Sequence, residues 1–225
     1  MFVQPGLSPA VASLSLLLFA LSPLAPAADF SSYRVLKLGM SIAAAAKAAG
    51  TVPGEATVIH KRPALLQEMH WRPGSTSSDS VQDALLCFFN GQLSRIVVTY
   101  DRYRVEGLTP KDMIDGISLV YGPAATPKAE IALRSIYSET AEVLARWEQA
   151  DSSWNLVRTG DGASFALVGY STRLDTLSLA AAVEAVRLDA AEAPLRDAAR
   201  QTKRDDDESS AREKARSTNK PAFHP

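Results

Sequence analysis

The sequence predicts an α+β fold built from two tandem repeats, each a helix followed by three strands. Three observations support this prediction. The tripeptides Gly-Met-Ser at 39–41 and Gly-Leu-Thr at 107–109 each open a helix-forming run that closes on a glycine. A proline follows each closing glycine within three residues, and strand-like segments follow each run. Duplication of one such unit predicts a single antiparallel sheet with helices on one face.

The first repeat is expected over residues 28–105. Ser41 is a suitable N-cap for a helix over Ile42–Ala49, because its hydroxyl can accept from a free backbone N–H, and Gly50 can end that helix. Strands are predicted over 56–60, 82–89 and Gln92–Tyr100, while 64–71 fits either a strand or a short helix. Asn-Gly at 90–91 predicts a tight hairpin turn between the last two strands.

The second repeat is expected over residues 106–177. Thr109 is predicted to cap a helix that begins at Pro110 and buries a stripe containing Met113, Ile117 and Val120. Strands are predicted over 143–149, 153–158 and 164–170. Residues 131–137 fit either a further strand or part of a helix.

The tail, residues 178–225, is rich in alanine and charge. Leu179, Val183, Val186 and Leu188 predict that its first half is a helix resting on the domain. Pro194 is expected to kink or break that helix. After residue 195 the mixed charges have no apolar side chains to bury, so we expect either a lone solvated helix or a disordered segment.

The first 27 residues resemble a secretory signal peptide. An apolar stretch ends in Ala-Pro-Ala at 25–27, a small-x-small cleavage pattern, although no basic residue precedes Arg34. The stretch is shorter than the roughly 20 residues that span a bilayer. We therefore expect export to the periplasm or beyond after cleavage near Ala27, with no transmembrane segment in the mature chain.

Composition narrows the classes of partner. The 225 residues carry 24 basic and 25 acidic side chains, a formal net charge of −1. This balance produces no long-range positive electrostatic field that would attract nucleic acid. Hydrophobic residues make up 46% of the chain, enough for a core. The single cysteine, Cys87, cannot form an internal disulfide, and its apolar strand predicts a buried thiol.

The two capped openings, their closing glycines and the strands behind them resemble a group of exported bacterial modules. These are the outer-membrane assembly lipoproteins of the SmpA/OmlA type and the tandem-repeat β-lactamase inhibitory proteins. The resemblance spans residues 33–170 and implies an antiparallel sheet that presents a face to a protein target. The chain departs from both families, because it has no lipid-acceptor cysteine and no cysteine pair for a disulfide.

Catalytic and metal-binding patterns are weak in this sequence, so we predict no catalytic residue, metal or cofactor. His60 and His70 flank Glu68, but their spacing matches no zinc pattern. No Gly-x-Ser-x-Gly or glycine-rich phosphate loop occurs. A small hydrolase or ligand-binding protein that uses this region is retained as an alternative function.

Candidate binding residues come from the polar strand faces and one loop entrance. By alternation, Trp147 and Trp154 are predicted to be core, whereas Trp71 precedes a loop and is predicted to be exposed. The candidate set is Trp71, Arg95, Thr99, Arg146, Glu148 and Asn155.

These observations predict a non-enzymatic exported protein that binds another envelope protein or assists envelope assembly. A second alternative is a cell-envelope tether that acts through the charged tail.

Overall fold

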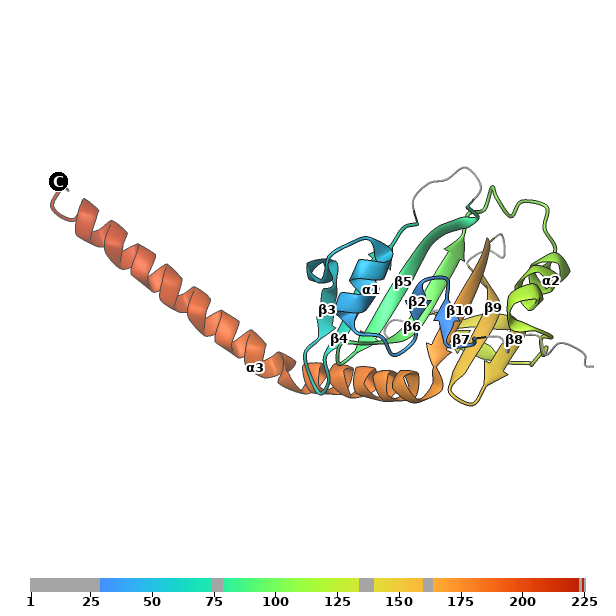
Figure 1. Cartoon of the computed structure of the whole chain (residues 1–225). Helices are drawn as coiled ribbons and strands as arrows, with labels where there is room; N and C mark the ends of the chain where they lie inside the picture. The colour runs from blue at the N-terminus through green and yellow to red at the C-terminus, as the bar shows by residue number, and fades with distance from the viewer. Residues whose placement is uncertain (1–28, 74–78, 134–139, 160–163, 223, 225) are drawn as a thin grey trace, which may run out of the picture.

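The computed structural model describes residues 29–73, 79–133, 140–159, 164–222 and 224 (Figure 1). The leader at 1–27, most of the serine-rich loop that follows Trp71 and the turn at 160–162 lie outside these ranges. The architecture is α+β, as predicted, with a large antiparallel sheet of eight strands and three α-helices, the last of them long.

The sheet has the strand order β3-β4-β5-β6-β10-β9-β8-β7, and every neighbouring pair is antiparallel. The central contact joins β6 to β10, so the first four strands form one half of the sheet and the last four form the other. The strands are β3 (Thr57–His60), β4 (Leu66–Trp71), β5 (Val81–Phe89), β6 (Gln92–Tyr100), β7 (Glu130–Ala132), β8 (Thr140–Gln149), β9 (Ser152–Thr159) and β10 (Ser164–Ser171).

Helix α1 (Ile42–Ala49) and helix α2 (Pro110–Tyr121) are each followed by four strands, one more than predicted. In the first half the ambiguous segment 64–71 supplies the extra strand, β4. In the second half part of the undecided segment 131–137 lies in β7, whose short run gave too little alternation to identify. Between β5 and β6, Asn90 and Gly91 both have positive φ, 48° and 76°, which confirms the predicted turn.

The predicted helix caps are present. The Ser41 hydroxyl accepts from the Ala44 backbone N–H, and Gly50 ends α1 in the left-handed conformation at φ 70°. Thr109 and Asp112 form a capping box at the start of α2, because each side chain accepts from the other's backbone N–H. These contacts join residues that are close in the sequence, so they define the start of each helix without any contact to the sheet.

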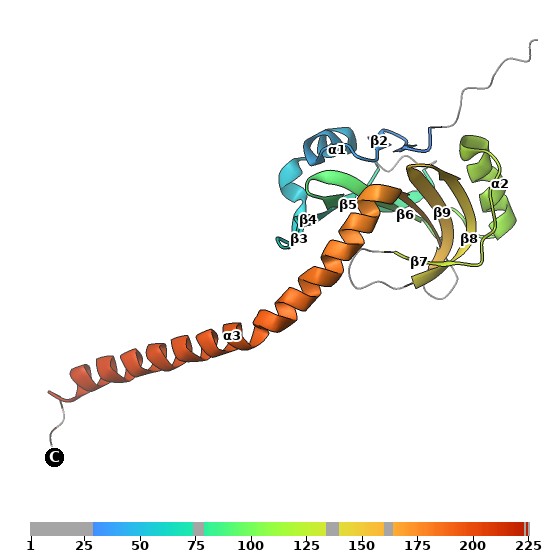
Figure 2. The same cartoon turned by 90° about the horizontal axis from the view of Figure 1, so that it is seen from below.

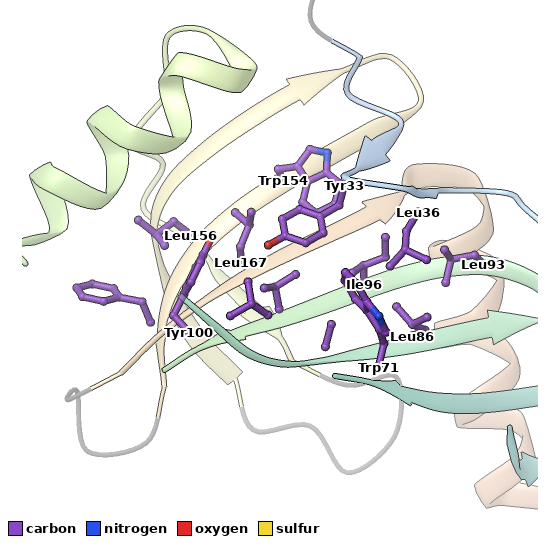
Figure 3. Packing of buried hydrophobic residues seen from close by; sticks show 14 of the residues in the cluster. Tyr33, Leu36, Trp71, Leu86, Leu93, Ile96, Tyr100, Trp154, Leu156 and Leu167 are labelled. Carbon is purple, nitrogen blue, oxygen red and sulfur yellow. The ribbon is translucent and has the colours of Figure 1, made fainter. Parts of the chain in front are cut away.

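Helices α1 and α2 lie on one side of the sheet, here called the helix face, and α3 lies on the other (Figure 2). Trp147 and Trp154 are both buried in the core of the helix face, as predicted. Val120 was expected in this core but is 64% exposed, and Tyr121 at the end of the helix is buried instead. Figure 3 shows part of this core, in which Trp154 lies beside Tyr33.

A two-stranded hairpin, β1 (Ser32–Tyr33) and β2 (Leu36–Lys37), extends the helix-face core. The indole N–H of Trp154 donates to the Phe30 carbonyl at 2.8 Å, and Arg34 donates to both carboxylate oxygens of Asp79 at 2.8 and 2.9 Å. This bidentate hydrogen bonding from Arg34 lowers the pKa of Asp79 to about 2. The segment that follows the predicted cleavage site is therefore fixed to the sheet.

Helix α3 (Thr172–Asn219) starts directly after β10 and runs through Pro194 without a break. Of the two alternatives expected after residue 195, the structure has the lone solvated helix, because α3 continues to Asn219 with every residue from 194 exposed. Hydrogen-bonded pairs three or four residues apart support this outer part, among them Gln201 with Asp205 at 2.8 Å. Figure 1 shows the helix changing direction between the part beside the sheet and the part that leaves it.

The inner part of α3 is a helix that rests on the sheet, as predicted, but of the four predicted contact residues only Leu179 and Leu188 are half-buried. Val183 and Val186 are 73% and 50% exposed. Small and polar side chains together with one leucine make the contact instead. The buried residues are Leu174, Asp175, Ser178, Ala181, Ala182 and Ala185. Within the described part of the chain no helix is long and apolar enough to cross a membrane.

Candidate binding surface

The face opposite the helix face carries five of the six candidate residues. The strand register places them in three rows that run across β6, β10, β9 and β8. These rows are Arg95–Tyr170–Ser153–Glu148, Val97–Val168–Asn155–Arg146 and Thr99–Ala166–Val157–Val143. Alternation along the strands thus placed these side chains correctly on one face.

Arg95 is not available on this face, because its side chain is buried. It is 1% exposed, and its guanidinium donates to both carboxylate oxygens of Asp175 on α3 at 2.8 and 2.7 Å. A third N–H donates to the Ala132 carbonyl in β7, and the guanidinium lies 5.5 Å from the Tyr170 ring centroid. Arg95 therefore joins β6, β7 and α3 inside the protein.

Asn155 and Arg146 form a second polar contact on the same face. The Arg146 Nε–H donates to the Asn155 side-chain oxygen at 2.7 Å, and the Asn155 amide nitrogen donates to the Ser153 hydroxyl at 3.1 Å. Asn155 is fully buried, whereas Arg146 is half-buried. The asparagine therefore orients the arginine, and only the arginine can reach a partner.

Glu148 and Thr99 lie at two other edges of this surface. Glu148 is exposed on β8, next to Arg146 on the same side of the strand, and Thr99 is half-buried on β6. Of the candidate residues on this face, Glu148 and Arg146 are the charged groups that a partner can reach. Val97, Val168, Val157 and Ala166 between them are buried in a second core with Ile131 of β7. We call the accessible pair, together with Thr99, the open sheet surface.

Trp71 was predicted to be exposed, and this prediction is wrong. It ends β4 and is 8% exposed, packed in the helix-face core near Leu86 and Ile96 (Figure 3). The loop sequence behind it suggested exposure. However, Trp71 has the strand phase of the fully buried Met69, so its ring points to the core.

The two histidines of the alternative catalytic site lie beside different carboxylates. His60 Nδ1 is 3.5 Å from Asp189 on α3, and His70 Nδ1 is 3.7 Å from Asp83 on β5. Among the described residues no three His, Cys, Asp or Glu side chains gather as metal ligands would. His60 instead belongs to the contact between β3 and α3.

Sequence reasoning missed the residues of α3 that complete this face. Asp175 lies in the first turn of the helix, where an acidic side chain is ordinarily explained by the helix dipole, so nothing linked it to Arg95. Glu192 was likewise missed, and it accepts two hydrogen bonds from Arg62 at 2.9 and 2.7 Å. Partners 80 and 130 positions apart leave no local pattern.

Comparison of the chain with family models, with curated proteins and with solved structures finds no match.

Proposed function

We propose that this protein is a non-enzymatic exported module that binds another protein of the cell envelope. The observation that carries the proposal is the outer part of α3, which leaves the domain as a fully exposed helix while its inner part is fixed to the sheet (Figure 1). A helix that is polar on all sides gains nothing from its own domain and suits contact with, or spacing from, another molecule.

The contacts between the inner part of α3 and the sheet support a fixed orientation of this helix relative to the domain. Three ion pairs hold the inner part: Arg95–Asp175 at 2.7 Å, Arg62–Glu192 at 2.7 Å and the weaker contact of His60 with Asp189 at 3.5 Å. The first is buried and therefore fixes orientation more than it adds stability. The outer helix would then hold its far end about 35 Å from the domain at 1.5 Å per residue.

Strand order supports the tandem-repeat interpretation of the fold. In each half, β3-β4-β5-β6 and β7-β8-β9-β10, the chain runs from the outermost strand of the sheet to its centre. Each half also follows one helix of the helix face in the sequence. We propose that the two halves are copies of one unit. The proposed similarity to tandem-repeat inhibitors and envelope assembly lipoproteins follows from this arrangement, with the open sheet surface as the face toward a partner.

A tether is the second candidate function, and the same projecting helix favours it. In that case the outer part of α3 would itself contact an envelope polymer, and the sheet would serve as a base. Deletion of residues 196–225 separates the two functions. A tether loses envelope association in fractionation, whereas a module that binds through the sheet retains it.

The proposal is tested by affinity purification of a tagged protein from mildly crosslinked envelopes. Arg146→Glu and Glu148→Lys change the open sheet surface, and Lys111→Glu on α2 is the matched control, since Lys111 is 80% exposed on the other face. We expect one dominant partner that is lost in the first two variants and kept in the control. An identical recovery pattern in all variants and in the deletion would refute the proposal.

A further inference from the structure

The edge of β4 is left without a neighbouring strand over its last three residues. Strand β3 pairs with β4 only as far as Thr57 opposite Glu68. Met69, His70 and Trp71 continue the strand and pair only with β5 on its other side. In the described part of the chain no other backbone group hydrogen-bonds to these three residues.

A short 3₁₀ turn is the reason for this gap. If β3 continued backward in register, Glu55 would lie opposite His70 and Gly54 opposite Trp71. Instead Pro53 starts the turn η1 (Pro53–Glu55), which bends the chain away from β4. Because Pro53 has a fixed φ and no N–H, this segment does not add to the ladder.

A hollow of about 470 Å³ lies beside the unpaired edge. The end of α1 and the turn η1 form one wall, and the end of β4 forms the other. Its lining residues are Ala49, Gly50, Thr51, Glu55, His70, Trp71 and Arg72. Figure 1 shows α1 and β3 at this end of the sheet.

The polar groups of the hollow are unused within the described chain. The Thr51 hydroxyl is buried with no hydrogen-bond partner. Glu55 and Arg72 are exposed, and no ion pair joins either of them to another described residue. A basic group and an acidic group thus line a hollow next to free strand backbone.

We propose that this hollow binds an extended peptide segment of a partner protein, which pairs with β4 in the place that β3 leaves. Its backbone adds to the edge at Met69–Trp71 by β-augmentation. An acidic side chain of the peptide pairs with Arg72, and a basic side chain two residues away, on the same side of the strand, pairs with Glu55.

The inference rests on the proposed protein-binding role for the class of ligand, but it uses neither the open sheet surface nor α3. The probe is an eight-residue peptide, acetylated and amidated at its ends, of alternating Thr and Val with one Glu and one Lys two residues apart. Both orders of the charged pair are tested by calorimetry and by ¹⁵N NMR. We expect one order to bind and to shift the backbone resonances of residues 69–72 and Thr51.

Three controls determine the outcome. Arg72→Glu is expected to weaken binding about tenfold, and replacing the Glu of the peptide by Lys is expected to restore part of it. Arg102→Glu, at an exposed site away from the hollow, is expected to leave binding unchanged. A peptide with proline at its centre lacks one ladder N–H and is expected not to bind.

The inference is overturned if neither peptide order binds, if the proline peptide binds equally well, or if Arg72→Glu and Arg102→Glu have the same effect. Loss of this site alone would leave the envelope partner of the tagged protein intact. Peptide binding without any envelope partner would instead remove the function proposed for the open sheet surface and α3.

Discussion

Gly169 leaves no room for a side chain, and this predicts a large loss of stability from the smallest possible substitution. A Cβ atom at this position on β10 would lie 2.1 Å from Cζ3 of the Trp154 ring. The ring is fully buried and stacks on Tyr121 at a centroid distance of 5.3 Å, and its N–H donates to the Phe30 carbonyl. Gly169→Ala therefore forces the indole away from partners on both sides.

The expected cost has two parts. Overpacking of a filled core costs about 1–3 kcal/mol. Displacement of the indole from the Phe30 carbonyl adds about 1 kcal/mol for the lost hydrogen bond. Together they lower the free energy of unfolding by about 3 kcal/mol, which corresponds to a fall in Tm of roughly 6–12 °C for a domain of this size.

Urea unfolding followed by circular dichroism measures this effect. The matched control is Gly116→Ala in α2, where a Cβ meets nothing within 4 Å and removal of a helix glycine is expected to raise stability by about 0.5–1 kcal/mol. Combining Gly169→Ala with Trp154→Phe makes room for the methyl group, so the double variant is expected to be more stable than the sum of its parts. A loss below about 0.5 kcal/mol for Gly169→Ala would refute the packing argument.

Three further predictions concern the charged contacts. Asp175→Asn leaves Arg95 buried without its counter-charge and is expected to lower the free energy of unfolding in urea by about 3–5 kcal/mol. Replacing both Arg95 and Asp175 by apolar residues of similar volume is expected to cost far less. Equal losses in the two variants would contradict this prediction. The folded pKa of Asp79 lies below its ordinary value of 3.8, so its pair with Arg34 is expected to stabilise the fold fully above about pH 4 and to lose that contribution as the pH falls toward 2. The effect on the free energy of unfolding is about 1 kcal/mol after allowance for exposure. In acid titrations of stability, Asp79→Asn is expected to abolish this pH dependence. Truncation after Leu195 is expected to change the urea midpoint of the domain by less than about 0.5 kcal/mol while lowering helicity by circular dichroism, since the removed residues are exposed; a larger shift would show that the outer helix packs on the domain.

Local signals in the sequence predicted the elements well. Ser41 and Thr109 identified the starts of both helices, and Asn-Gly at 90–91 identified the central hairpin, because capping and turn geometry depend on a few adjacent residues. Alternation also placed Arg95, Asn155 and Arg146 on the same face. Local patterns thus determine which side of the sheet a strand residue occupies.

Contacts between distant parts of the chain could not be predicted in this way. The burial of Arg95 depends on Asp175, and the register of β3 against β4 depends on the turn at Pro53. The outer tail could not be assigned between a helix and disorder because it buries nothing, and the structure shows i to i+4 pairs that support a helix without burial. The exposure of Trp71 was predicted wrongly because the residues after it have the composition of a loop. Its alternation with Met69 along the strand, which indicates burial, was given less weight.

The proposed function requires that an envelope protein contacts the exposed surfaces of this molecule. In-cell crosslinking with a photoreactive amino acid at Glu148 on β8 or Arg204 on α3, followed by mass spectrometry, tests it most directly. Lys111 is the control position. The account predicts one dominant crosslinked partner from at least one of the two positions and none from Lys111. Absence of any crosslinked protein at both positions, or the same products at all three, would contradict it.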